Sequence, residues 1–218
     1  GTQLSRLLVP AQAEARVTAA YHAVVGETPA LAEEAYSCKL RVMDNELAAE
    51  LAMLTRLFAR VAWSVAATGD LTELALRRAL REMIAKLGVY RTYADDAGLP
   101  ARDRRELARA IALARRAQPQ IPPAVFDFVS ALLCGELGPE YDPRSIRAAI
   151  GRFQQYTGPV MAKGLEDTAL YRYNRLVALN EVGSHPDRFS LSIAAFHDAN
   201  RRRLETHPHS MIATSTHD

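Results

Sequence analysis

The sequence predicts a mainly α protein, a bundle-like arrangement of several helices with little strand. Apolar residues recur every three or four positions along most of the 218 residues, which is the spacing that gathers them on one face of a helix. Prolines, glycines and capping residues separate these stretches at intervals typical of helix ends. Because 49% of the residues are apolar, the chain can bury a substantial core.

Two helices are expected before residue 66. Residues 11–26 are rich in alanine and form the first. Thr28 then supplies an N-cap, and Pro29 occupies the first helical position of a long amphipathic helix. Apolar residues at helical spacing continue to Val65, so this second helix is expected to run from Pro29 to Val65.

Two more helices and one extended segment follow. Residues 70–88 open with a pattern that resembles a capping box and end in a glycine, as a helix does. Residues 89–93 combine β-branched and aromatic side chains, which favours an extended segment. A proline at position 100 opens the next helix, over residues 101–117.

Prolines mark the middle of the chain. Those at positions 119, 122 and 123 interrupt the helical pattern, and a strongly apolar helix is expected over residues 124–137. A division near these prolines gives two helical subdomains, residues 1–120 and residues 121–210. A single helical domain fits the sequence equally well.

The last third of the chain is less regular. Residues 142–173 begin as a capped helix and run into a segment where Gly-Pro and Lys-Gly pairs suggest turns. Residues 174–182 are expected to add a short helix, and Ser190 or Ser192 to cap the final one. Residues 211–218 form a short β-like run. Since an unpaired strand leaves its backbone groups unsatisfied, we expect this end to belong to a larger structure.

Charge and composition argue against several classes of protein. The net charge is only +2, so the basic surface that binds nucleic acid or an anionic membrane is missing. No apolar run approaches about 18 residues, the length of a membrane span, and no secretion signal opens the chain. Cys38 and Cys134 are interpreted as reduced core residues. A cytoplasmic location is expected.

Neither a metal nor a cofactor is expected. His207, His209 and His217 lie near the C-terminus, but they lack the helical spacing and the nearby carboxylate pair of a zinc site. The other histidines and acids fit solvated positions on helices.

Residues 151–173 differ from their neighbours because unlike polar groups gather there. The group comprises Gln154, Gln155, Tyr156, Lys163, Glu166, Asp167, Tyr171, Arg172 and Tyr173. Sugar hydroxyls both donate and accept hydrogen bonds, and sugar faces are apolar, so amides, carboxylates, a cation and aromatic rings together favour a carbohydrate site. Ordinary connectors and core tyrosines are the alternative interpretation.

One long segment resembles a known family. Residues 153–183, FQQYTGPVMAKGLEDTALYRYNRLVALNEVG, together with residues 196–197 and the terminal ATSTHD, closely resemble maltooligosyltrehalose synthases of the α-amylase superfamily. Residues 39–62 and 88–93 resemble them more loosely. The departures are Leu165, Leu170 and Ser184, where valine, phenylalanine and glycine are expected.

The resemblance implies a helical insertion excised from a (β/α)8-barrel enzyme. Residues 211–218 would begin the barrel strand that ends in His-Asp, and the family's nucleophile and acid/base would lie on strands absent from this chain. The family reaction converts the reducing-end α-1,4 bond of a maltooligosaccharide into an α,α-1,1 bond by intramolecular transglycosylation, without a cofactor. The chain alone is expected to be inactive, with the sugar and the rest of the barrel as its partners.

The resemblance also implies roles for individual residues. Asp218 matches the superfamily carboxylate that stabilises the transition state, and His217 would bind the same sugar. The released glucose must turn over and attack before water does, which requires a closed pocket. The groups expected to hydrogen-bond this glucose are Lys163, Glu166 and Asp167, and the expected aromatic walls are Tyr90, Tyr156, Tyr171 or Tyr173.

Two alternatives stay open. Glu166 or Asp167 could instead pair with Arg172 or cap a helix. The chain could also be a freestanding helical module that binds carbohydrate or protein without catalysis. A helical regulator ranks last, because the sequence has no basic recognition helix.

Overall fold

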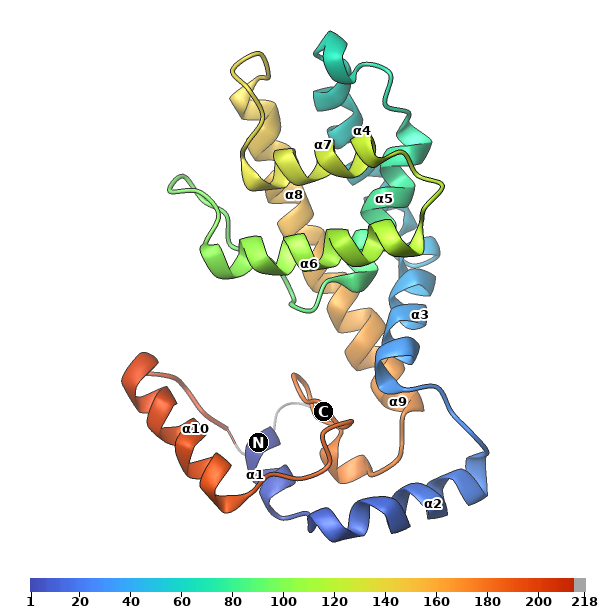
Figure 1. The fold of residues 1–218 in the computed structure, drawn as a ribbon, viewed down its shortest axis with the longest axis vertical. Coiled ribbons are helices and arrows are strands. Elements are labelled where there is room, and N and C mark those ends of the chain that lie inside the picture. The colour runs from blue at the N-terminus through green and yellow to red at the C-terminus, as the bar shows by residue number, and fades with distance from the viewer. Residues whose placement is uncertain (214–218) are drawn as a thin grey trace. The chain divides into compact units, whose positions relative to one another are not determined.

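A computed structural model describes residues 1–213, and this part of the chain is mainly helical, as the sequence predicts (Figure 1). The described residues contain no β-strand, and one isolated antiparallel bridge joins Asp95 to Gly98. They divide into two compact units. Unit 1 comprises residues 1–35 and the chain from Glu166 onward, and unit 2 comprises residues 36–165.

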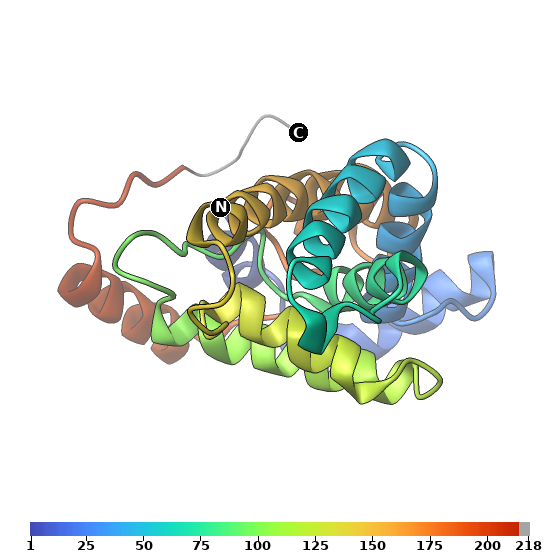
Figure 2. The same cartoon turned by 90° about the horizontal axis from the view of Figure 1, so that it is seen from above.

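Unit 2 is a two-layer helical bundle. Its helices are the greater part of α3 (Leu31–Asp44), α4 (Ala48–Trp63), α5 (Glu73–Lys86), α6 (Ala101–Ala117), α7 (Pro123–Cys134) and α8 (Pro143–Met161). Helix α5 is central, because it contacts α4, α6 and α7, while α4 also packs on α8. Figures 1 and 2 show α6 and α7 side by side, running across α5 and α8 as a second layer.

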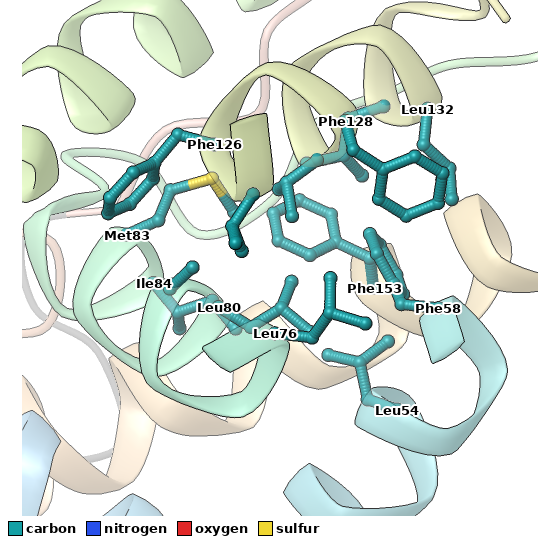
Figure 3. Packing of buried hydrophobic residues seen from close by; sticks show 14 of the residues in the cluster. Leu54, Phe58, Leu76, Leu80, Met83, Ile84, Phe126, Phe128, Leu132 and Phe153 are labelled. Atoms are coloured by element: carbon teal, nitrogen blue, oxygen red, sulfur yellow. The ribbon is translucent and has the colours of Figure 1, made fainter. Parts of the chain in front are cut away.

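The apolar core of unit 2 lies between these layers. Phe58 of α4, Phe126 of α7 and Phe153 of α8 are fully buried and meet α5 residues such as Leu80 and Met83 (Figure 3). Burying a side chain of this size contributes about 1.5–3 kcal/mol. Unit 2 is therefore held together mainly by apolar burial.

Unit 1 is built from shorter elements. They are α1 (Thr2–Leu7), the 3-10 helix η1 (Ala11–Ala13), α2 (Glu14–Val25), the first turn of α3, the end of the π-helix η3 (Ala162–Ala169), α9 (Leu170–Arg172), the 3-10 helix η4 (Val177–Leu179) and α10 (Ile193–Thr206). The helices α1, α2 and α10, all within the described residues, bury no side chain. Unit 1 thus has little apolar core.

Several helix starts are confirmed. Helix α6 spans the predicted residues 101–117. Asp142 caps α8, because its carboxylate accepts hydrogen bonds from the backbone N–H groups of Arg144 and Ser145. Ser192 caps α10 in the same way, accepting from the N–H of Ala195 at 3.2 Å.

The single helix predicted from Pro29 to Val65 is wrong. Residues 45–47 separate α3 from α4. The Asn45 side chain donates to the carbonyl of Arg41 at 2.7 Å, and the N–H of Leu47 donates to the carbonyl of Val42 at 2.9 Å. Asparagine competes in this way for backbone groups of a helix, and apolar spacing does not report that competition.

The turns predicted at Gly158-Pro159 and at Lys163-Gly164 are also wrong. Helix α8 continues through Pro159 to Met161, and η3 follows and contains Lys163 and Gly164. Pro159 has no N–H to donate and its ring crowds the preceding turn, which favours a local change from α to π geometry just after it.

Three other segments differ from the prediction. The helix predicted over residues 124–137 ends at Cys134, because Gly135 takes a left-handed conformation with φ of 68°. Residues 174–182 contain only the short η4. Residues 211–213 have no regular structure, and the remainder of the predicted terminal strand lies outside the described residues.

The prolines at 119–123 do not separate the two units. They lie within unit 2, between α6 and α7, which pack against each other and both against α5. A proline break in the chain is compatible with continuous packing, because the helices on either side share one apolar core.

Candidate functional site

The polar segment 151–173 folds into most of α8, η3 and α9. Within η3, the side chains of Lys163 and Asp167 are exposed, whereas Glu166 is only 7% exposed. Lys163 belongs to unit 2, and the two acids belong to unit 1. π-Helical turns are rare and are often found at functional sites, so η3 marks a candidate functional site.

In unit 1, the Glu166 carboxylate supports a turn. Its Oε1 accepts a hydrogen bond from the N–H of Gly183 at 3.1 Å. Gly183 has a φ of 69°, a conformation that favours glycine. The hydroxyl of Ser184 accepts from the N–H of Glu181 at 3.1 Å and closes the turn. This arrangement brings a second carboxylate, Glu181, to the same pocket as Glu166.

A pocket of about 180 Å³ lies beside this turn and is called the Glu166 pocket. Its lining residues are Glu166, Leu170, Tyr171, Asn174, Val177, Asn180 and Glu181. The volume is below the roughly 300–1,000 Å³ of pockets for drug-sized ligands, so it suits one small ring. Carboxylates and amides for hydroxyl groups, with an aromatic ring and aliphatic side chains for an apolar face, match the chemistry of a sugar.

Asn180 lines this pocket and carries a buried acceptor. Its Nδ2 donates to the carbonyls of Leu170 at 2.7 Å and Tyr173 at 2.8 Å, which fixes the orientation of the amide. Its Oδ1 is buried and has no hydrogen-bond partner among the described residues. A buried acceptor normally has a donor, so this oxygen is an exception among the described residues.

The tyrosines expected to wall the site have different environments. Tyr171 lines the Glu166 pocket and is 69% exposed. Tyr173 is partly buried, which raises the pKa of its hydroxyl, and it lines a different pocket of about 230 Å³ with Tyr21 and Arg172. Of these tyrosines, only Tyr171 has its side chain at the pocket that Glu166 lines.

The two remaining tyrosines belong to unit 2. Tyr156 lies in the apolar core, where its hydroxyl donates to the carbonyl of Leu47 at 3.1 Å and burial raises its pKa. Tyr156 therefore fits the alternative interpretation, in which the tyrosines of residues 151–173 are ordinary core residues. Tyr90 is partly exposed on the segment that follows α5.

Gln154, one of the two amides noted in the sequence, is engaged with the backbone. Its Oε1 accepts from the N–H of Ala94 at 2.7 Å, and its Nε2 donates to the carbonyl of the same residue at 3.2 Å. Asp103 accepts from the N–H of Tyr93 at 2.7 Å. These contacts hold residues 92–94, which have no helical or strand structure, so Gln154 has a structural role. Gln155 is exposed.

Arg172, named in the alternative interpretation, forms an ion pair with Glu34 of α3 at 3.0 Å, within unit 1. Sequence reasoning missed Asn174 and Asn180 as pocket residues. The signal that could have found them is their position inside residues 153–183, the stretch that carries the resemblance.

The described residues also bear on the predicted terminal residues, on metal-binding groups and on membrane-spanning helices. His217 and Asp218 lie outside the described residues. Among residues 1–213, no group of three or more metal-ligating side chains is placed to hold an ion. None of the helices in this range is long and apolar enough to cross a membrane.

Comparison with known proteins gives consistent results. No protein-family model matches the chain. A Mycobacterium tuberculosis (strain H37Rv) protein named as a maltooligosyl trehalose synthase is 30% identical, and the match covers 99% of this chain and 25% of that protein. The structure of maltooligosyltrehalose synthase from Arthrobacter ramosus matches all of this chain and 25% of that one, with 35% identity and a TM-score of 0.78. A glycosyltrehalose synthase, DSM5389, is 27% identical over 93% of this chain and 21% of its own, with a TM-score of 0.60.

The chain thus spans about a quarter of the length of the relatives it matches. Its helical fold corresponds to a helical part of those larger proteins. The resemblance seen in residues 153–183 therefore extends along the whole chain, which is similar to about a quarter of the length of maltooligosyltrehalose synthases.

Proposed function

We propose that the chain is the helical part of an intramolecular transglycosylase, a (1→4)-α-D-glucan 1-α-D-glucosylmutase. The complete enzyme would convert the reducing-end α-1,4 bond of a maltooligosaccharide into an α,α-1,1 bond and so form maltooligosyl trehalose in the cytoplasm. The names of the relatives support this reaction. The Glu166 pocket is the observation in this chain that carries it, because its lining combines hydroxyl-binding groups with an aromatic ring.

The proposed task of the pocket residues is to retain the displaced glucose. In a retaining mechanism, a glycosyl-enzyme forms on one carboxylate and a second group cycles between acid and base. The leaving glucose must then turn and attack through its anomeric hydroxyl before water does. Glu166 would bind this glucose by hydrogen bonds beside the ring of Tyr171. Asp167, Lys163, Tyr173 and Tyr90 are proposed as further sugar-binding residues of the complete enzyme. Excluding water there is what favours transfer over hydrolysis.

The nucleophile and the acid/base are proposed to lie in other parts of the complete enzyme. Asp218 would stabilise the transition state and His217 would bind the transferred sugar, at the end of a barrel strand. The chain by itself is therefore proposed to be inactive.

Exposed apolar side chains in unit 1 support a second partner, the rest of the same polypeptide. Large apolar residues that are at least half exposed there are Leu8, Val24, Val25, Tyr171, Val177, Ile193, Leu204, Met211 and Ile212. Single exposed apolar residues are ordinary, but many on one small unit are typical of a surface that another part of a protein covers.

The test is Lys163→Ala in the complete enzyme. Losing a donor to the displaced glucose should lower the ratio of α,α-1,1 product to hydrolysis roughly tenfold or more, since mispositioning of about 1 Å can cost about a hundredfold in rate. NMR of the anomeric protons measures this ratio. Arg116→Ala, which removes an exposed cation from α6, is the matched control and should leave the ratio unchanged.

Two results would contradict the proposal. An unchanged ratio in Lys163→Ala would remove Lys163 from the site. If the complete enzyme made no α,α-1,1 product, while calorimetry showed that it bound maltooligosaccharides, the freestanding carbohydrate-binding alternative would replace the transglycosylase.

A further inference from the structure

Lys39 is a buried cation that the proposed site does not use. It lies on α3 in unit 2, is 6% exposed, and its Nζ donates to the carbonyl of Leu87 at 2.9 Å. Burying an ammonium group is costly unless it is paired or hydrogen-bonded. A side chain buried at this cost is expected to have a specific structural task.

Lys39 acts first at the C-terminus of α5. The helix ends at Lys86, and the next carbonyl, that of Leu87, is the acceptor for Lys39. Arg109 of α6 donates to the carbonyl of Lys86 at 3.2 Å. Cations at this position satisfy orphan carbonyls and complement the helix dipole. Lys39 therefore fixes the point where the chain leaves α5 toward Tyr90, three residues on.

Lys39 also lies against Gly164 in η3. A Cβ atom built on Gly164 would lie 2.7 Å from Cγ and 2.9 Å from Cα of Lys39. The second of these atoms belongs to the backbone of α3, so a larger residue could not be accommodated by moving the end of a flexible side chain. Gly164 thus allows η3 to lie directly on α3 at Lys39, and this contact sets the position of the neighbouring Lys163.

We propose that Lys39 is a positioning residue, which holds residues 162–165 of η3 and the segment around Tyr90 in one fixed arrangement through Gly164 and the Leu87 carbonyl. The functional consequence rests on the proposed function, in which Lys163 and Tyr90 contact the displaced glucose. The positioning of these two segments by Lys39 does not depend on the proposed function.

The first arm of the test measures product in the complete enzyme. Gly164→Ala should lower the ratio of α,α-1,1 product to hydrolysis roughly ten- to hundredfold, because it displaces Lys163. Lys39→Met keeps the length of the stem but removes the donor, and should act in the same direction with a smaller effect. A general loss of stability would lower both products together and leave the ratio unchanged. Gly158→Ala is the matched control, because its new Cβ would have no neighbour within 4 Å.

The second arm is independent of sugar. In Lys39→Met, backbone amides of residues 88–92 and 162–165 should exchange with deuterium about tenfold faster than in the wild type, while amides in the middle of α5 stay unchanged. Faster exchange in residues 88–92 alone would make Lys39 a simple cap of α5 and would overturn the proposal. It is also overturned if neither segment changes.

A double variant tests whether Lys39 acts through Gly164. Lys39→Ala removes the Cγ atom that Gly164→Ala would meet, so the effect of Gly164→Ala on exchange should be smaller in the Lys39→Ala background. Additive effects would contradict the coupling. If both segments respond in exchange but the product ratio does not, the positioning role stands and the proposed sugar contacts of Lys163 and Tyr90 fail.

Discussion

Units 1 and 2 are both helical, but they are stabilised in different ways. Unit 2 has a contiguous apolar core to which α3, α4, α5, α6, α7 and α8 contribute. In unit 1, the helices α1, α2 and α10 bury no side chain, and polar contacts join distant parts of the chain. The difference indicates that apolar burial stabilises unit 2, whereas unit 1 depends more on polar contacts.

Arg175 shows how polar contacts join distant segments in unit 1. Its guanidinium pairs with Glu14 of α2 at 3.1 Å and donates to the carbonyls of Pro186 and Asp187, both at 3.1 Å. It also lies over the ring of Phe189, 5.1 Å from the centroid. One side chain therefore joins three segments that share little apolar contact.

The largest expected effect is in the core of unit 2. Phe153→Ala should lower the free energy of unfolding by about 3–5 kcal/mol, because the cavity left among α5, α7 and α8 cannot collapse fully. Urea unfolding followed by fluorescence of Trp63 measures this, since it is the only tryptophan and lies on α4. Gln155→Ala, on the exposed side of the same helix, should change it by less than about 0.5 kcal/mol. Similar losses in both variants would disprove a core-based unit 2.

A pH effect of intermediate size should also belong to unit 2. Burial, and then the nearby Arg109, lower the pKa of Lys39 from 10.5 to about 8. Between these values the unfolded chain binds more protons than the folded one, so this contribution to stability rises with pH, by roughly 3 kcal/mol at most, and is lost as pH falls through 8. Urea unfolding of wild type and Lys39→Met at pH 7.5 and 9.5 measures it.

The expected result is a rise in stability with pH that Lys39→Met lacks. The upper pH is kept below 10 because Tyr36 acts in the opposite direction. Burial raises the pKa of its phenol from 10.0 to about 12, so this contribution to stability is lost as pH rises through that range. An equal rise in both proteins would assign the effect to groups other than Lys39.

A smaller effect is expected at the polar joint of unit 1. Arg175→Ala should cost about 2 kcal/mol locally, because the carbonyls that it satisfies lose their donor. Hydrogen exchange should accelerate in residues 14–18 and 185–189 while the amides of α5 keep their protection. Arg175→Lys should not restore protection, since an ammonium cannot reproduce the fork of the guanidinium. Loss of protection in α5 would contradict the conclusion that the two units are stabilised in different ways.

The same contrast explains what could be predicted from the sequence. Apolar spacing reports helices that share a core, so the sequence predicts α5, α6 and α8. The predicted starts of α6 and α8 are confirmed, whereas α5 begins at Glu73 with Thr72 as its N-cap, not at Asp70. The break at Asn45 and the π-helix around Lys163 arise from particular backbone contacts, which spacing does not encode. At the site, Glu166 and Tyr171 were predicted from residue type and resemblance. Asn174 and Asn180 were missed because unit 1 brings them to the pocket through an irregular chain path with no periodic signal.

The smallest effect tests whether unit 1 is completed by other structure. Ile193 on α10 is 69% exposed, so Ile193→Ser should change the unfolding free energy of the 218-residue chain by less than about 0.5 kcal/mol. In the complete enzyme the same substitution should increase hydrogen exchange in α10, because it would remove apolar area buried against the rest of the polypeptide. Thr206→Ser, a mild change at the end of the same helix, is the control. Equal, negligible effects in both proteins would mean that this face of α10 stays in water, and unit 1 would then depend on its polar contacts alone.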